Sequence, residues 1–228
     1  GLGDVYKRQT INRGDTGTIS TMISGVQLIY SNGNGTVSTM SGGEQQIKTG
    51  AMGTVSTMSG GLQLVDDGGT GTVIAMSGGS QKVYSGANGT ISTMSAGEQT
   101  IKSGGNGTVI TMNSGWQNID YGGTGTINTM SGGQQTVKSG GAGTIGTMSS
   151  GMQEISSGGT GTVVTMTSGE QNIYSDGTGT VSTMNDGGQY ITSGTGTIST
   201  MSGGYQEISS GTGTVSTMSG GEQNIYLS

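Results

Sequence analysis

The acidic side chains are the groups best suited to acid–base chemistry in this chain, because its 228 residues include no His and no Cys. The 13 Asp and Glu residues occupy different places relative to the repeated Gly-Thr pairs described below. A catalytic nucleophile needs a base at a defined place beside it, and no such pairing is readable from these positions. The sequence therefore predicts no catalytic residues and no enzyme.

A metal site is not predicted either. Calcium-binding β-rolls need Asp at a fixed place in each Gly-rich turn, and Ca²⁺ takes about six to eight oxygen ligands. The turn carboxylates here are isolated from one another: Asp66, Asp67, Asp120, Asp176 and Asp186. We expect neither a metal ion nor a cofactor.

Hydroxyl groups form the most regular chemical pattern. Thr36 and Ser38 recur one repeat later as Thr54 and Ser56, which predicts two parallel columns of outward hydroxyls. A flat Thr/Ser face is what ice-binding solenoids use, so ice binding is an alternative function. The second column is interrupted in five units, by Ile74, Ile110, Asn128, Gly146 and Val164.

These residues belong to one short unit that is copied along the chain. Its Gly-Thr pair starts at 12 glycines, 18 residues apart and 17 in the last two steps: Gly17, Gly35, Gly53, Gly71, Gly89, Gly107, Gly125, Gly143, Gly161, Gly179, Gly196 and Gly213. With this Gly as position 1, every unit has Thr at position 2, Val or Ile at 3, Met at 6, Gly at 9, Gln at 11 and Val or Ile at 13. Position 5 is Thr in every unit except one, which has Ala75. A fixed period of this length indicates a solenoid.

Two β-forming runs lie in each unit, bounded by Gly and Ser near positions 7–9 and 15–18. This pattern predicts an all-β fold, a parallel β-solenoid of about twelve rungs of 17–18 residues, with two short strands and two turns per rung. Successive rungs would stack about 4.8 Å apart. A left-handed hexapeptide helix fits less well, because it needs apolar residues six positions apart.

Side-chain alternation places Val37 with Thr39 on one strand face, and Gln45 with Ile47 on one face of the next strand. We place these faces inward, which predicts internal ladders of Val/Ile, Thr and Gln with hydrogen bonds between successive Gln amides. Strict alternation would expose Met40, but a row of exposed Met would be a large apolar stripe, so we expect the corner to turn it inward. The ladder residues expected in two successive rungs are Val37, Met40, Gln45, Ile47, Val55, Met58, Gln63 and Val65.

Composition and charge exclude several partners. The net charge is −6 and the seven basic residues are scattered, so nucleic-acid binding is not expected. No apolar run approaches the roughly 20 residues of a membrane-spanning helix. Residues 1–8 do not follow the unit and resemble translated adapter sequence, so we assign the solenoid domain to residues 9–228. The missing initiating Met suggests a fragment of a longer chain.

Positions 10 and 12 vary between units and should face outward along one strand face. The apolar and aromatic residues there are the best candidates for lateral contact: Val26, Leu28, Leu62, Leu64, Trp116, Tyr190 and Tyr205. Many weak contacts along a rod can sum through avidity.

The segments Thr57–Val65 and Thr129–Val137, with their Thr-Met-Ser-Gly-Gly-x-Gln pattern, resemble the repeats of AIDA-type autotransporter adhesins. The resemblance extends from Gln9 to Tyr226, although the family unit is commonly one residue longer and usually has Val in place of Met. It implies a β-helical passenger at the surface of a Gram-negative bacterium, exported through an outer-membrane barrel outside this chain.

The same resemblance implies a role in adhesion, self-association and biofilm formation, with a second copy and host or abiotic surfaces as partners. It also implies a glycosyltransferase that adds heptose to serines of the Met-Ser-Gly-Gly turn. The candidate acceptors are Ser41, Ser59, Ser77, Ser131, Ser202 and Ser219. A structural spacer is the remaining alternative.

Overall fold

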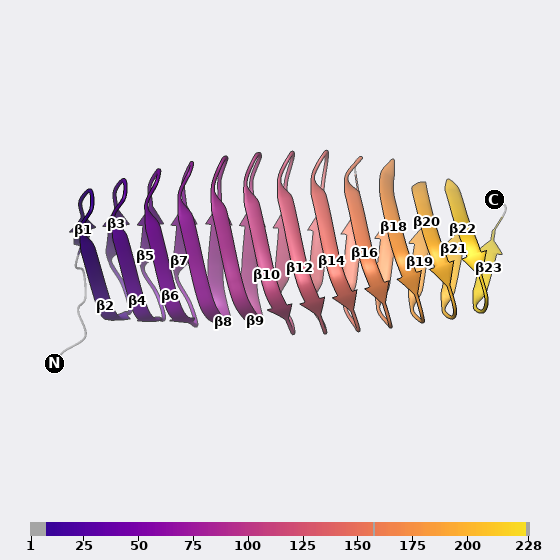
Figure 1. The fold of residues 1–228 in the computed structure, drawn as a ribbon, viewed down its shortest axis with the longest axis horizontal. Helices are drawn as coiled ribbons and strands as arrows, with labels where there is room; N and C mark the ends of the chain where they lie inside the picture. The colour runs from indigo at the N-terminus through magenta and orange to yellow at the C-terminus, as the bar shows by residue number, and fades with distance from the viewer. Residues whose placement is uncertain (1–7, 157, 227–228) are drawn as a thin grey trace.

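The computed structural model describes residues 8–156 and 158–226, which form 23 β-strands stacked into a rod with the N- and C-termini at opposite ends (Figure 1). Residues 1–7, most of the segment predicted to be outside the repeat, lie outside the described residues. The first strand begins at Arg8, which pairs with Val26 at repeat position 10. The predicted parallel β-solenoid with two strands per rung is confirmed.

One column of parallel strands carries repeat positions 1–6. Its members are β2 (Thr16–Met22), β4 (Asn34–Met40), β6 (Met52–Met58), β10 (Asn106–Met112), β12 (Thr124–Met130), β14 (Ala142–Met148), β16 (Thr160–Met166), β18 (Gly177–Met184), β20 (Gly194–Met201) and β22 (Thr212–Met218). Two longer strands, β8 (Thr70–Val83) and β9 (Asn88–Ile101), run through the corner and join both columns.

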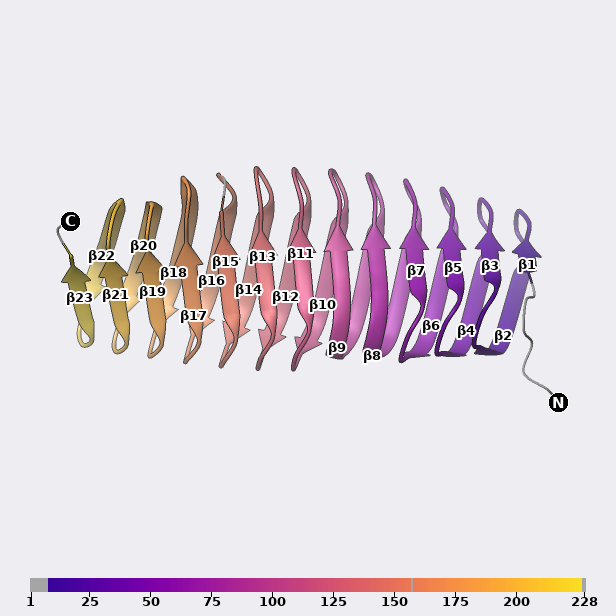
Figure 2. The ribbon, with the colours of Figure 1, turned by 180° about the vertical axis from the view of Figure 1, so that it is seen from behind.

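The second column carries positions 10–13 and is seen from its own side in Figure 2. Its members are β1 (Arg8–Ile11), β3 (Val26–Ile29), β5 (Glu44–Ile47), β7 (Leu62–Val65), β11 (Trp116–Ile119), β13 (Gln134–Val137), β15 (Met152–Ile155), β17 (Glu170–Ile173), β19 (Gly188–Ile191), β21 (Tyr205–Ile208) and β23 (Glu222–Ile225).

Identical repeat positions are register partners on successive rungs. Val37 lies beside Val55 and Met40 beside Met58. The register is unchanged in the 17-residue rungs, where Met184 still pairs with Met201. The missing residue is therefore absorbed at a corner, and the internal columns stay aligned.

The inward faces depart from strict alternation at one place. In β4, Val37 and Met40 are buried while Ser38 and Thr39 are both exposed. Two consecutive outward residues reset the alternation, so the methionine points into the core. The expectation that Met40 and Met58 are buried is confirmed, whereas the predicted inward Thr ladder, with Thr39 as its example, is wrong because Met takes that interior space.

Apolar columns fill the space between the two sheets. Val37, Met40, Ile47, Val55, Met58 and Val65 are all 0% exposed. Gly at position 1 is required where the two sheets approach most closely, since a Cβ on Gly35 would lie 2.3 Å from Ile29 Cδ1. The Gly-Thr signature thus follows from the narrow cross-section of the rod.

A continuous ladder of glutamine amides runs through the interior. In each of twelve steps from Gln9 to Gln223, the Nε2 of one Gln donates to the Oε1 of the Gln in the preceding rung over 2.5–2.7 Å. Gln45 also donates to the carbonyl oxygen of Gly35 in the opposite strand over 3.3 Å. The predicted bonding between successive amides is confirmed, and Gln45 and Gln63 are completely buried.

Both corners depend on residues that tolerate positive φ. The Gly at position 9 has positive φ in each of the 12 units, with Gly43 at 78° as an example. At position 16, Asn32 and Asp176 adopt φ of 59° and 61° where most other rungs have Gly. Asn and Asp enter this left-handed region more readily than other non-glycine residues.

Candidate interaction surfaces

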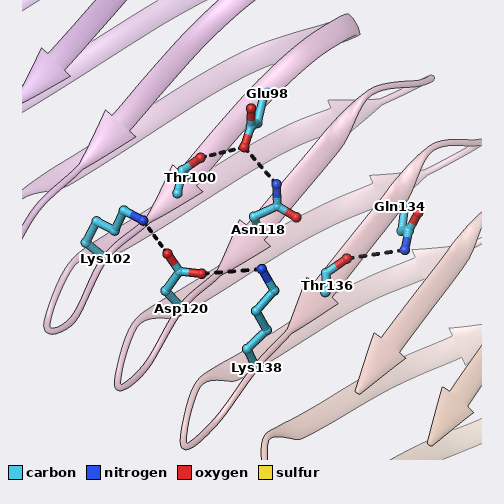
Figure 3. A network of polar contacts seen from close by, with 8 residues as sticks. All are labelled: Glu98, Thr100, Lys102, Asn118, Asp120, Gln134, Thr136 and Lys138. Carbon is cyan, nitrogen blue, oxygen red and sulfur yellow. Dashed lines mark hydrogen bonds and ion pairs between the residues drawn. The ribbon is translucent and has the colours of Figure 1, made fainter. Parts of the chain in front are cut away.

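The outward face of the second column carries most of the variable side chains. Lys102 forms an ion pair with Asp120 on the next rung, and Lys138 Nζ lies 3.7 Å from the other Asp120 oxygen (Figure 3). Lys48 and Asp66 form an equivalent pair. These charges are therefore paired between neighbouring rungs. Exposed pairs of this kind contribute little to stability.

Glu98 is the centre of a second polar contact. Its carboxylate accepts hydrogen bonds from Thr100 Oγ1 at 2.7 Å and from Asn118 Nδ2 at 2.8 Å (Figure 3). The Thr100 hydrogen bond is the main reason why the pKa of Glu98 lies below its usual value, and burial opposes it. The carboxylate is therefore held ionised in a structural bond, which does not suit a proton-transfer role.

A groove of about 600 Å³ lies along the corner that precedes the second column. It runs parallel to the rod axis, because its position-10 residues are register partners on successive strands: Trp116, Gln134, Met152, Glu170 and, after Gly188, Tyr205. The other lining residues are Ser114, Gly115, Gly133, Ser150, Gly151, Ser168, Gly169 and Gly187. Trp116 is 54% exposed at one end.

Two predicted contact residues pack on each other at the far end of this groove. The rings of Tyr190 and Tyr205 meet edge to face with centroids 5.3 Å apart, and their hydroxyls are hydrogen-bonded. Tyr205 lies over Gly188, where a Cβ would be 2.8 Å from the ring. A smaller hollow of about 250 Å³ lies beside Tyr190, with Glu170 and Glu207 in its walls.

The remaining contact candidates form a separate cluster. Leu62 and Leu64 are half-buried in β7, and the position-10 residues Ser80 and Glu98 separate Leu62 from Trp116 along the rod. Val26 is also half-buried. The expectation that Leu28 is exposed is wrong: it is 5% exposed. The six candidates that remain at least partly accessible, Val26, Leu62, Leu64, Trp116, Tyr190 and Tyr205, therefore do not form one continuous stripe.

The six candidate glycan acceptors, Ser41, Ser59, Ser77, Ser131, Ser202 and Ser219, are all exposed at position 7 of the first corner. Gly follows each of them in the sequence, so the corner is uncrowded on that side. The hydroxyls of Ser77, Ser202 and Ser219 each donate weakly, over 3.4 Å, to the Met carbonyl of the preceding rung.

The hydroxyl face of the first column differs from the expected one. Thr36 at position 2 is half-buried and Ser38 is exposed, as predicted, but Thr39 at position 5 also points outward. Position 5 is Thr in every unit except the one with Ala75, so this column is more regular than the interrupted position-4 column. The outward Thr column at position 5 was not predicted, because strict alternation places Thr39 inside.

Over residues 8–156 and 158–226, no group of three or more acidic side chains is placed to hold a metal ion. The same part of the chain contains no helix long and apolar enough to cross a membrane.

The groove itself was not predictable from the repeat pattern. Gln134, Met152, Glu170 and the position-8 serines come from different rungs, and only the register brings them together. One partial signal was available in the sequence: position 8 is Ser at Ser114, Ser150 and Ser168, although Ser24 also has it outside the groove and Gly132 interrupts it within.

The fold and its outward faces define a β-solenoid whose repeated residues build the interior and whose variable residues line the surface. The chain is similar to the hyper-glycosylated TibA fragment, glycosylated by TibC, whose crystal structure has been solved. The TM-score is 0.62 at 25% sequence identity, and the similarity covers 97% of this chain and 93% of that one. TibA is an AIDA-type autotransporter adhesin, so the predicted resemblance is confirmed in structure. Neither the family models nor the curated proteins give a match.

Proposed function

We propose that this chain is part of the passenger of a bacterial surface adhesin and has no enzymatic activity. The observation that carries the proposal is the similarity to the TibA fragment over 97% of the chain. The rod supports it, because a rigid solenoid holds many similar outward faces at fixed spacing and sums weak contacts through avidity. Its location would be the cell surface of a Gram-negative bacterium.

Lateral self-association is the mechanism we favour, with adhesion to host or abiotic surfaces and biofilm formation as its consequences. The accessible contact residues that we take as the main surface are Leu62, Leu64, Trp116, Tyr190 and Tyr205, and Val26 is a further half-buried candidate. Trp116, which is 54% exposed, has the most accessible ring of the three aromatic residues among them. Exposed aromatic side chains are enriched in protein interfaces.

The test is cell aggregation after display of the chain on a non-aggregating bacterium. Clumping is expected, and the double variant Trp116→Ser/Tyr205→Ser should reduce it without unfolding the rod. Tyr121→Ser is the matched control, because Tyr121 is an exposed aromatic residue, 69% accessible, outside the groove. Absence of clumping would favour a purely structural spacer.

Glycosylation is proposed at Ser41, Ser59, Ser77, Ser131, Ser202 and Ser219. The support is their shared exposure beside glycine and the hyper-glycosylated state of the similar TibA fragment. Co-expression with a heptosyltransferase that modifies AIDA-type adhesins should add heptose-sized masses to peptides containing these serines. Unmodified peptides under those conditions would refute this part of the proposal.

Ice binding is the second candidate, and one observation favours it. The nearly complete Thr column at position 5 lies on the same outward face as the Thr column at position 2, with one rung spacing of about 4.8 Å between successive hydroxyls. Thermal hysteresis and ice shaping by the purified chain test it. Thr129→Leu should reduce both effects, and their absence in the parent chain would remove this candidate.

A further inference from the structure

Three of the rungs that form the groove carry Ser at position 8, namely Ser114, Ser150 and Ser168, while the rung between the first two keeps Gly132. Of the five preceding rungs, the first has Ser24 at this position and the other four have Gly42, Gly60, Gly78 and Ala96. A Cβ on Gly60 would lie 2.4 Å from the carbonyl oxygen of Ser41 in the preceding rung. A serine at this position therefore requires a local shift of the corner. Departures from a local rule at such a cost tend to mark functional sites.

The shape of the groove suits an extended ligand. Trp116 and Tyr205 lie five rungs apart, which at about 4.8 Å per rung is about 24 Å. Its lining includes five position-9 glycines and the position-10 residues Trp116, Gln134, Met152, Glu170 and Tyr205. A small, compact cofactor would leave most of this length unoccupied.

The lining also restricts the chemistry of the ligand. Glu170 is the one charged residue in the lining, and it is negative, so phosphates and polyanions are disfavoured. Met152 supplies the one aliphatic side chain of the lining, which is too little for an apolar peptide. The other side-chain groups of the lining that could contact a ligand are two aromatic rings, one amide, one carboxylate and three serine hydroxyls.

This combination fits a hydroxyl-rich ring with apolar faces. The exposed ring of Trp116 and the accessible part of the half-buried Tyr205 ring can pack on the C–H faces of a sugar, since aromatic side chains supply large flat apolar surfaces. The Gln134 amide nitrogen already donates to Glu154 Oε2 over 2.8 Å and to Thr136 Oγ1 over 3.3 Å, so the amide oxygen is its group for a ligand. That oxygen and the Glu170 carboxylate can both accept hydrogen bonds from sugar hydroxyls.

We propose that this groove binds a linear, neutral oligosaccharide, with Trp116 and Tyr205 as stacking platforms and Gln134 and Glu170 as hydroxyl partners. The inference rests on the proposed adhesive function, since it names a partner for one part of the contact surface. Gly188 has a positioning role, because its missing side chain leaves the space over which Tyr205 lies.

Trp116 provides a direct test because it is the single tryptophan of the chain. The purified 228-residue protein is titrated with cellohexaose, maltohexaose, mannohexaose and chitohexaose, and tryptophan fluorescence is followed. At least one of them should give a saturable blue shift at concentrations up to about 5 mM. Calorimetry with the same sugar should show that Trp116→Ala abolishes the binding heat.

Gly188→Ala is the more specific test, because it keeps the Trp116 fluorescence signal. The other rungs carry side chains at position 10, so the scaffold accepts Ala there, but the new Cβ would displace the Tyr205 ring. Affinity should fall about tenfold or more while the Trp116 signal remains measurable. Tyr121→Ala, outside the groove, should leave affinity unchanged.

Three outcomes would overturn the proposal: no response to any of the four sugars, binding that survives both Trp116→Ala and Gly188→Ala, or tighter binding of oligogalacturonate than of neutral sugars. The adhesin proposal is tested independently by cell aggregation. Sugar binding without clumping would refute self-association alone, and clumping without sugar binding would refute the groove assignment alone.

Discussion

The Nε2 of Gln117 donates a hydrogen bond to the Oε1 of Gln99 over 2.7 Å, from one rung to the rung before it. Gln135 donates to Gln117 in the same direction over 2.6 Å. All amides of this column therefore point the same way, and such chains polarise one another and strengthen each bond. The column satisfies polar groups in an interior where unpaired ones would be costly.

Gln117→Leu should destabilise the rod more than any surface substitution. It leaves the Gln99 oxygen without its donor and removes the Gln117 acceptor from Gln135. Each buried unpaired group costs about 1–3 kcal/mol, so we expect a loss of about 2–6 kcal/mol. Urea unfolding followed by circular dichroism measures it. Gln134→Leu, on the outward face, removes the part-buried hydrogen bonds of its amide to Glu154 and Thr136 and should cost about 0.5–1.5 kcal/mol. Equal losses in both variants would contradict a special role for the ladder.

Gly125→Ala should also destabilise the rod, because its side chain would clash with the interior. Its Cβ would lie 2.4 Å from Ile119 Cδ1 and 2.9 Å from Gln117 Oε1. Overpacking of this kind costs about 1–3 kcal/mol. Thr124→Ala, at the neighbouring exposed position, is the control for thermal unfolding. A melting temperature of Gly125→Ala equal to that of the control would show that the sheets can separate without cost.

The rod was predictable from sequence because its scaffold residues recur at fixed offsets, and the Gln and Val/Ile columns lie where alternation places them. Thr39 was misplaced because alternation alone cannot reveal two consecutive outward residues. Met40 indicated the departure, because strict alternation would expose this apolar residue unless two consecutive residues before it both pointed outward. The groove required the register between rungs, because Trp116 and Tyr205 are 89 positions apart in the sequence but belong to one line of position-10 residues.

Oxidation by peroxide should distinguish the buried methionines of the interior column from the exposed ones. Of the 14 methionines, Met52 is 56% exposed and Met218 in the last rung is 45% exposed, whereas Met40 and Met130 are 0% exposed. Brief treatment of the folded chain with hydrogen peroxide should convert Met52 and Met218 to sulfoxides first. Peptide mass spectrometry gives the extent at each site, and the unfolded chain in urea is the control in which all should react alike. Rapid oxidation of Met130 in the folded chain would place the column outside the core.

The tyrosine pair at the end of the groove should give the rod a specific alkaline sensitivity. The pKa of Tyr190 is raised above its usual value, first by the hydrogen bond with Tyr205 and then by burial. A group whose folded pKa is raised contributes stability that is complete below its unfolded pKa, about 10 for tyrosine, and that is lost as pH rises further. The urea midpoint should therefore fall between about pH 10 and pH 12. Tyr190→Phe and Tyr205→Phe should each flatten that fall, and the double variant should flatten it no further, because both single changes remove the same bond. If the urea midpoint of Tyr190→Phe falls as steeply with pH as that of the parent chain, other groups cause the loss of stability.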